Sequence, residues 1–245
     1  MPSFLHTPQN RRIAYHLTEG DGPGLIFLGG YRSDMSGTKA VALAAWACAQ
    51  GRAYLRFDYS GHGQSGGDFN TLGIGDWLDD AQAALGLTTG RQVLVGSSMG
   101  GWIALLLARA MPERVARLVG IASAPDFTED SLLPSLTLAE QAALKAKGRI
   151  ERPSAYSPEP YVFTQVLIEQ GRAHLVLRSP LSLPFPTRFL QGSADGDVSP
   201  NVALRLFNHA TGPDIRLTLV QGADHRFSTP DCLRLIEAAV TEVSA

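Results

Sequence analysis

Ser98 stands at the centre of the segment Gly96-Ser97-Ser98-Met99-Gly100, between an apolar strand and an apolar helix. This G-x-S-x-G spacing is typical of a sharp strand-to-helix turn that exposes the central hydroxyl. We expect a strained, left-handed backbone at Ser98, and glycines at 96 and 100 because side chains there would clash. The following helix favours negative charge at its start. The pattern predicts that Ser98 is a nucleophile; Ser97, one position from the apex, is the weaker candidate.

Ser98 needs a base, because a serine hydroxyl is a poor nucleophile at neutral pH. His225 directly follows the last apolar strand, in LTLVQGADHRF, where a loop can bring it to the serine. After such a turn, the acid and then the histidine follow along the chain. His62, in the loop GHGQSGG, could line the pocket or serve only a turn. The other histidines lie too early, before the expected acid, or away from a strand end: His6, His16, His174 and His209.

The acid is expected in the segment QGSADGDVSP, which follows another predicted strand and offers Asp195 and Asp197. Asp195 lies three residues before Val198, an arrangement that turns its carboxylate toward the histidine loop. We predict that Asp195 holds the imidazole of His225 in the correct tautomer and stabilises its protonated form. Asp197 is the alternative, with a helix-capping role as its simpler interpretation. Asp224 cannot easily fold back onto its own neighbour.

An oxyanion hole is predicted from two backbone N–H groups. The first strand ends in the segment FLGGY, and its loop is expected to supply the N–H of Tyr31. The second donor is expected from Met99, the residue after the nucleophile. One such donor can be worth about 10²–10³ in rate. The alternative interpretation of FLGGY is a plain glycine-rich turn.

The elements that must position these residues alternate between apolar runs of strand length and longer runs of helical period. Successive positions of several strands are apolar, as expected when helices cover both faces of a parallel sheet. The alternation predicts one α/β domain with a mostly parallel, doubly wound sheet. Strands are predicted at 25–28, 53–57, 92–95, 115–122, 187–190 and 215–220, and helices at 40–50, 75–85, 101–111, 201–208 and 231–243.

Residues 124–186 interrupt this alternation with a proline-rich stretch that carries short amphipathic pieces at 135–147 and 161–169. We interpret it as a helical lid inserted into a core formed by residues 1–123 and 187–245; ordinary crossover helices with long loops are the alternative. Its apolar side chains could wall an acyl groove, although helical spacing more often indicates packing. They are Leu132, Leu133, Leu136, Leu138, Val162, Phe163, Val166 and Leu167.

Composition narrows the class of protein. The 245 residues suit one α/β domain. The net charge of −2, from 21 basic and 23 acidic residues, does not indicate the basic surface expected of a protein that binds nucleic acid. Cys48 and Cys232 are expected to be buried and to form no disulfide framework or metal site. The first residues do not resemble a signal peptide, and no apolar run is long enough to span a membrane. We therefore expect a cytoplasmic protein without a metal or cofactor.

Four segments carry a family resemblance: GYRSDMSGTKA, RFDYSGHGQSGG, VGSSMGGW and DHRF. They resemble the α/β-hydrolase family that includes a mitochondrial palmitoyl-protein thioesterase, also described as a mycophenolic acid acyl-glucuronide esterase. The likeness runs from about residue 29 to the C-terminus and is weakest in the expected lid. It implies an α/β-hydrolase fold and cofactor-free hydrolysis of acyl esters or thioesters. The family's nucleophile, acid and base map onto Ser98, Asp195 and His225, and the organelle is not carried over.

We therefore hypothesise a serine hydrolase that forms an acyl-enzyme on Ser98. The expected substrate is an acyl ester or thioester, on a protein or a small molecule, with S-depalmitoylation and acyl-glucuronide hydrolysis as candidate reactions. The same triad could serve a peptidase, a lactonase or an acyltransferase. A cofactor-free oxidative reaction, or a hydrolase-fold binding module without turnover, is a less favoured alternative. The sequence does not indicate the oligomeric state.

Overall fold

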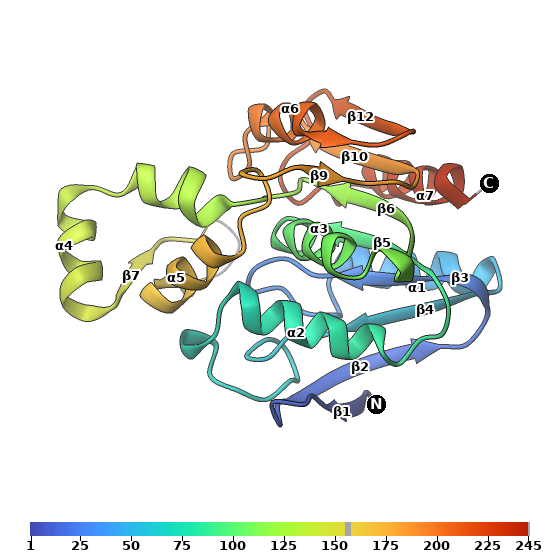
Figure 1. Cartoon of the computed structure of the whole chain (residues 1–245), viewed down its shortest axis with the longest axis horizontal. Coiled ribbons are helices and arrows are strands. Elements are labelled where there is room, and N and C mark those ends of the chain that lie inside the picture. Colours follow the sequence, from blue (N-terminus) through green and yellow to red (C-terminus); the bar gives the residue numbers. More distant parts are fainter. Residues whose placement is uncertain (155–157, 245) are drawn as a thin grey trace.

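An eight-stranded sheet runs through the molecule in the order β1-β2-β4-β3-β5-β6-β10-β12 (Figure 1). The computed structural model describes residues 1–154 and 158–244. Strands β4 to β12 of this order are parallel, whereas β2 runs antiparallel to both β1 and β4. The strands are β1 (Ser3–His6), β2 (Arg12–Thr18), β3 (Asp21–Leu28), β4 (Arg52–Phe57), β5 (Gln92–Ser97), β6 (Val115–Ile121), β10 (Thr187–Gly192) and β12 (Ile215–Val220).

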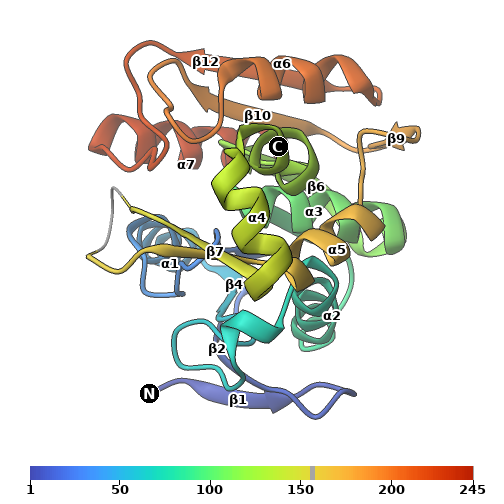
Figure 2. The ribbon, with the colours of Figure 1, turned by 90° about the vertical axis from the view of Figure 1, so that its left-hand side faces the viewer.

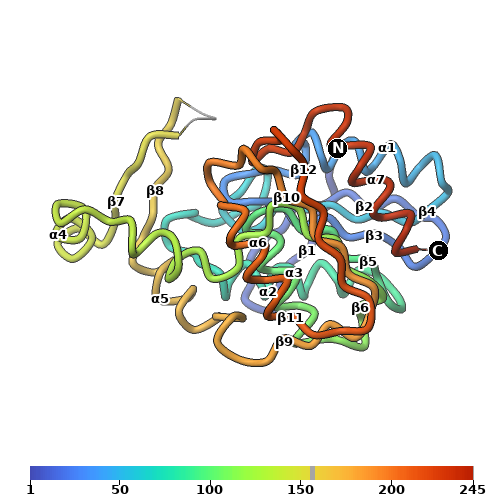
Figure 3. The backbone as a smooth tube through the Cα atoms, turned by 90° about the horizontal axis from the view of Figure 1, so that it is seen from above, coloured from blue at the N-terminus to red at the C-terminus, as the bar shows by residue number. Residues whose placement is uncertain are grey.

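Helices cover both faces of the sheet, as the apolar strands predict. Along β5, Leu94 belongs to one core cluster, and its neighbours Val93 and Val95 belong to the other. Successive side chains of a strand point to opposite faces, so both faces are buried. Helices α1 (Thr38–Ala49) and α7 (Pro230–Ser244) pack on the face of Val93 and Val95. Helices α2 (Ile74–Leu85), α3 (Met99–Ala110) and α6 (Pro200–His209) pack on the other face (Figure 3).

The predicted α/β-hydrolase fold is confirmed, and the predicted strands and helices form close to their expected limits. Strands β1 and β2 were not predicted, because both are partly exposed at the sheet edge and show no continuous apolar run. The two-residue pair of β9 (Leu181–Ser182) with β11 (Ala210–Thr211) was also missed. The expectation for Cys48 is wrong: Cys232 is buried, but Cys48 is exposed, because α1 turns Leu43 and Ala47 toward the sheet instead.

Residues 124–186, which we call the insertion, leave the sheet after β6 and return at β10. The insertion contains α4 (Leu138–Lys147), the antiparallel pair of β7 (Arg149–Arg152) with β8 (Tyr161–Thr164), and α5 (Gln165–Ala173). Elements α4, β7 and α5 project from one end of the body (Figure 1), the end that faces the viewer in Figure 2, whereas β9 lies beside the body. The chain changes from strand to helix at Thr164, whose hydroxyl accepts a hydrogen bond from the Leu167 N–H at 3.1 Å. The insertion therefore has a hairpin that the sequence did not reveal.

Both ends of the insertion meet at Asp126, a fully buried carboxylate just after β6. It accepts hydrogen bonds from the backbone N–H groups of Val176 and Leu177 at 2.8 and 3.0 Å, and from the guanidinium of Arg178 at 3.0 Å. Burial raises the pKa of Asp126, although these donors oppose the shift. The carboxylate joins the start of the insertion to its end.

Candidate active site

The turn between β5 and α3 places Ser98 at the carboxyl edge of the sheet with φ 54° and ψ −119°. This positive φ is uncommon for a residue with a side chain and indicates local strain. A methyl group on Gly96 would lie 2.4 Å from the carbonyl oxygen of Gly100, and one on Gly100 would lie 2.0 Å from that of Leu28. Both positions therefore require glycine. Ser97 is buried within β5, whereas Ser98 is partly exposed.

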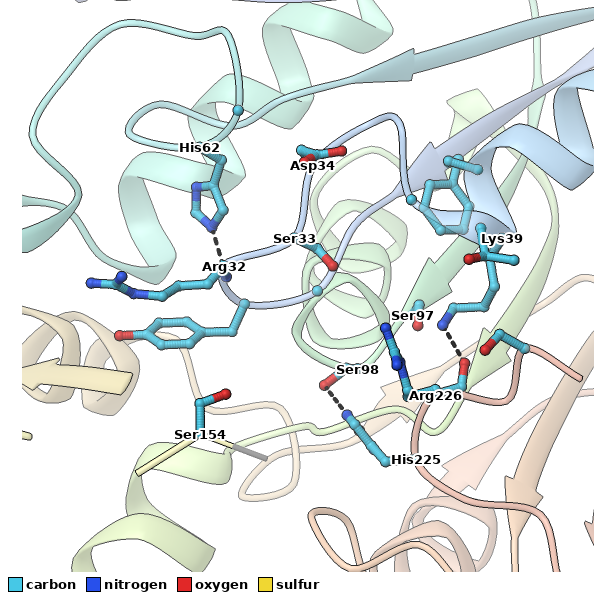
Figure 4. Close-up of a pocket in the computed structure, with 18 of the residues that line it drawn as sticks. Arg32, Ser33, Asp34, Lys39, His62, Ser97, Ser98, Ser154, His225 and Arg226 are labelled. Atoms are coloured by element: carbon cyan, nitrogen blue, oxygen red, sulfur yellow. Dashed lines mark hydrogen bonds between the residues drawn. The ribbon is translucent and has the colours of Figure 1, made fainter. Parts of the chain in front are cut away.

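The structure brings Ser98, His225 and Asp195 together from three separate loops. The Ser98 Oγ lies 3.1 Å from the Nε2 of His225 (Figure 4). The Nδ1 of the same imidazole lies 2.9 Å from the Oδ2 of Asp195. These distances suit a relay in which the imidazole takes the serine proton while the carboxylate fixes its tautomer. The three residues selected from the sequence therefore form one hydrogen-bonded chain.

The carboxylate of Asp195 is buried, and each of its oxygens accepts two hydrogen bonds. Oδ1 accepts from the backbone N–H groups of Asp197 and Val198 at 2.9 and 2.8 Å. Oδ2 faces His225 and also accepts from the side-chain amide of Gln191 at 2.9 Å. Burial alone would raise the pKa of Asp195, but these donors lower it below its ordinary value. The carboxylate is thus held ionised, and Asp197 supports it through its backbone.

Gln191 was not singled out from the sequence. It is fully buried at the end of β10, and its amide also donates to the carbonyl of Val198 at 3.0 Å. The signal available in the sequence was a glutamine directly after the apolar run of the predicted strand 187–190.

One group of described residues, Asp195, Asp197 and His225, places potential metal ligands within 4.8 Å of one another. Metal binding there would compete with contacts that already exist. Both oxygens of Asp195 accept hydrogen bonds at 2.8–2.9 Å, and both ring nitrogens of His225 have partners. The hydrogen-bonding pattern favours the serine relay over a metal centre.

The loop after β3 passes directly over Ser98. A methyl group on Gly30 would lie 3.4 Å from the Cβ of Ser98 and 4.0 Å from its Oγ. Within the described part of the chain, the backbone N–H groups of Tyr31 and Met99 donate no hydrogen bond. Both flank Ser98, one from the loop above it and one from the first residue of α3. Both are therefore available to an oxygen bound at the serine.

The side chain of Tyr31 connects this loop to the insertion. Its hydroxyl donates to the carbonyl of Val162 at 2.5 Å, and its ring stacks on Phe163 with centroids 5.5 Å apart. His62 lies on the opposite side of the loop, where its Nε2 accepts the Arg32 N–H at 3.2 Å (Figure 4). Of the two roles left open for His62, the structure shows a buried residue that lines the pocket.

A cavity of about 530 Å³ opens at Ser98 between the body and the insertion. Its walls are mostly polar and include the cationic residues Arg32, Lys39 and Arg226. Burial, together with the nearby charge of Arg226, lowers the pKa of Lys39 to about 8. Its ammonium donates to the carbonyl of Arg226 at 2.5 Å. None of the eight apolar residues considered for an acyl groove lines this cavity. Leu132 and Leu136 pack in the insertion's own core, and Leu167 packs in the main core.

The sheet, the strained serine turn and the loops above it are those of an α/β hydrolase. Residues 25–166 match the family described as serine aminopeptidase, S33. The chain is 36% identical over 243 residues to the palmitoyl-protein thioesterase ABHD10 of Rattus norvegicus. This alignment covers 98% of this chain and 82% of the relative. The human protein of that name is 34% identical over 243 residues, covering 98% and 79%.

Solved structures agree. The mouse α/β hydrolase domain-containing protein 10 superposes with a TM-score of 0.92 at 34% identity, over 100% of this chain and 98% of the other. The crystal structure of a protein from Agrobacterium vitis S4 superposes with a TM-score of 0.96 at 41% identity, over 99% of this chain and 98% of the other. The chain therefore belongs to the α/β-hydrolase family that contains the ABHD10 thioesterases. It is an ester or thioester hydrolase.

The expectation of a cytoplasmic location is wrong. The ABHD10 relatives from rat, cattle and mouse, matched over 98% of this chain, are named mitochondrial, which contradicts the expectation of a cytoplasmic protein. The expectation was a default that no residue pattern supported directly. Among the described residues, no helix has the length and apolar character needed to cross a membrane.

Proposed function

We propose that this hydrolase cleaves acyl esters and thioesters through a covalent acyl-enzyme on Ser98. The observation that carries the proposal is the hydrogen-bonded chain from the Ser98 Oγ through His225 to the buried Asp195. His225 removes the hydroxyl proton as the Ser98 Oγ attacks the carbonyl carbon. Asp195 keeps the Nδ1 proton of the imidazole in place, so that Nε2 is the free base.

The oxyanion of the tetrahedral intermediate is bound by the backbone N–H groups of Tyr31 and Met99. Neither group has another acceptor in the described part of the chain, so binding the oxyanion breaks no existing hydrogen bond. His225 then gives its proton to the leaving alcohol or thiol, and the acyl group stays on Ser98. The same imidazole then deprotonates a water molecule, which attacks the acyl-enzyme. The imidazolium returns that proton to the Ser98 Oγ as the acid leaves, and the Ser98 hydroxyl is restored.

The relatives and the insertion support a class of substrate. The ABHD10 relatives are named palmitoyl-protein thioesterases, which supports an acyl thioester on a protein as the physiological substrate of this chain. The insertion contributes Ser154, Glu159 and Tyr161 to the cavity walls, so it would act as a lid that selects the substrate. An acyl glucuronide, which is an ester with a polar leaving group, is the second candidate because the cavity walls are mostly polar.

The first experiment is labelling with a fluorophosphonate probe, with mass spectrometry to locate the adduct and Ser98→Ala as the control. One adduct on Ser98, absent from the variant, is the expected result. Matched ester, thioester and aminoacyl anilide substrates then separate hydrolysis of acyl groups from peptidase activity. An adduct on Ser97 would reject the assigned nucleophile, and no adduct together with no turnover would favour a binding module.

A further inference from the structure

Arg32, directly after the proposed oxyanion donor Tyr31, has a strained backbone. Its φ is 54°, in the left-handed region that residues with side chains rarely occupy. Such a conformation costs about 1–3 kcal/mol and persists only where the surroundings enforce it. The Arg32 N–H donates to the Nε2 of His62 at 3.2 Å. This hydrogen bond holds the Tyr31–Arg32 peptide in its strained position.

His62 is built as a fixed acceptor. Its Nδ1 lies 3.1 Å from the carbonyl oxygen of Ser60, which places the ring proton on Nδ1 and leaves the Nε2 lone pair for Arg32. Three aromatic rings pack edge-on against the imidazole, with centroids 5.0–5.7 Å away: Tyr59, Phe69 and Trp77. Burial lowers the pKa of His62 to about 4, so the imidazole is neutral at pH 7. Neither ring rotation nor protonation removes the acceptor.

Tyr31 is therefore restrained on two sides. Its side chain is held by the carbonyl of Val162 and the ring of Phe163, and the peptide after it is held by His62. The side chain and the following peptide fix two of the bonds at the Tyr31 Cα atom. The preceding peptide, which carries the Tyr31 N–H, can therefore move little. The carbonyl of Gly30, in the same peptide as the Tyr31 N–H, accepts the Ser33 N–H at 3.1 Å. This hydrogen bond and the contacts of Tyr31 and Arg32 together set the direction of the Tyr31 N–H in a loop that lies against Ser98.

We propose that His62 is a positioning residue for the oxyanion hole: by accepting the Arg32 N–H, it aims the Tyr31 N–H at the oxygen bound over Ser98. This inference rests on the proposed function. His62 does not touch the substrate in this role; it acts through the backbone of Arg32. Its effect belongs to the step in which the oxyanion forms, because a misdirected donor still allows the ground-state substrate to bind.

The test compares His62→Phe, which keeps a packed ring but has no acceptor, with His62→Gln, whose side-chain oxygen can accept the Arg32 N–H. Both are assayed on one thioester, with active sites counted by complete fluorophosphonate titration. We expect kcat of His62→Phe to fall about 10-fold to 100-fold, with KM changed less than about 3-fold. The loss should not exceed that from removing one oxyanion donor completely, about 10²–10³ in rate. His62→Gln should recover most of kcat.

A histidine that only filled space would give the opposite pattern. Unchanged kcat per titrated site in His62→Phe, even with a lower melting temperature, would overturn the proposal. If His62→Phe does not fold, His62→Asn takes its place, because its amide is too short to reach Arg32; equal kcat for the Asn and Gln variants would then overturn it. Turnover that survives Ser98→Ala would instead reject the proposed function, whatever the His62 variants show.

Discussion

At the scale of single residues, Asp195 divides its two oxygens between two tasks. Oδ1 binds the N–H groups of its own loop, and Oδ2 binds the imidazole of His225 and the amide of Gln191. The loop is therefore anchored by one oxygen, while the other sets the direction of the imidazole. An amide at this position offers only one acceptor atom, so it cannot satisfy both sets of donors.

Asp195→Asn should reduce kcat by about 10⁴, because the amide favours the wrong imidazole tautomer. The matched control is Asp197→Asn, which alters an exposed side chain and keeps the backbone N–H that Asp195 needs. We expect the control to stay within about 2-fold of the wild type in steady-state thioester assays. A silent Asp195→Asn beside an inactive Asp197→Asn would show that the acid was wrongly assigned.

The buried imidazole of His62 should make stability depend on pH. Its pKa is about 4 in the folded chain and about 6.5 when unfolded, so between these values the unfolded chain binds more protons. The stabilisation is fully present above pH 6.5 and is lost as the pH falls toward 4, by up to about 3 kcal/mol. Urea unfolding of the wild type and His62→Gln across this range measures it. The two free energies should converge as the pH falls, and parallel curves would contradict the buried neutral imidazole.

At the scale of elements, the insertion is attached to the body by apolar packing and by a few polar contacts. Its return segment contributes Val176, Leu177, Leu181, Leu183 and Phe185 to the main core. Its own small core consists of Leu132, Leu136, Ile150 and Ile168. Its hairpin meets the body where Val162 and Phe163 contact Tyr31. Asp126 joins its start to Val176 and Leu177, whose side chains are buried in the main core. Its position is therefore set by apolar packing of the return segment together with the polar contacts at Asp126 and Tyr31.

Asp126→Ala should destabilise the protein by at least about 3 kcal/mol, because the buried N–H groups of Val176 and Leu177 lose their acceptor. Asp130→Ala, which breaks only half-exposed ion pairs with Arg178 and Arg205, should cost less than about 1 kcal/mol. Chemical unfolding gives both values, and hydrogen exchange at residues 176 and 177 reports the local effect. Equal losses in the two variants would mean that Asp126 does not join the ends of the insertion.

At the scale of the whole molecule, the cavity lies where the body and the insertion meet, and its polar walls should govern substrate choice. Each methylene buried against apolar walls contributes about 0.8 kcal/mol, or about 4-fold in kcat/KM. We expect a smaller gain per methylene along a series of linear acyl thioesters, because the apolar side chains of the insertion pack inward and do not line the cavity. A steady gain of about 4-fold up to long chains would show that the insertion opens an apolar channel when substrate binds.

The sequence predicted those parts of the fold whose signal is local. Strands buried on both faces, such as β5, show as continuous apolar runs, and the serine turn shows as a fixed spacing of glycines. Partners distant in the chain left no comparable signal. Tyr31 and Val162 are 131 positions apart, and the acceptor role of His62 depends on the folding of another loop. Ser98, Asp195 and His225 are the exception, because a serine turn followed along the chain by an acid and then a histidine is itself a sequence pattern. The polarity of the cavity beside them depends on which distant loops meet there, and no such pattern predicts it.

The order of the site residues along the chain has a consequence for how the protein is made. Ser98 and both proposed oxyanion donors belong to the first half of the chain, whereas His225 follows the last strand, 127 positions after Ser98. A ribosome releases the chain from its N-terminus onward. The nascent protein therefore carries its proposed nucleophile long before its proposed base, and on this assignment we expect no hydrolysis of acyl groups until β12 has joined the sheet and His225 has followed it. We therefore expect that completing the synthesis activates the protein, and that a chain stopping short of residue 225 is inactive toward acyl substrates.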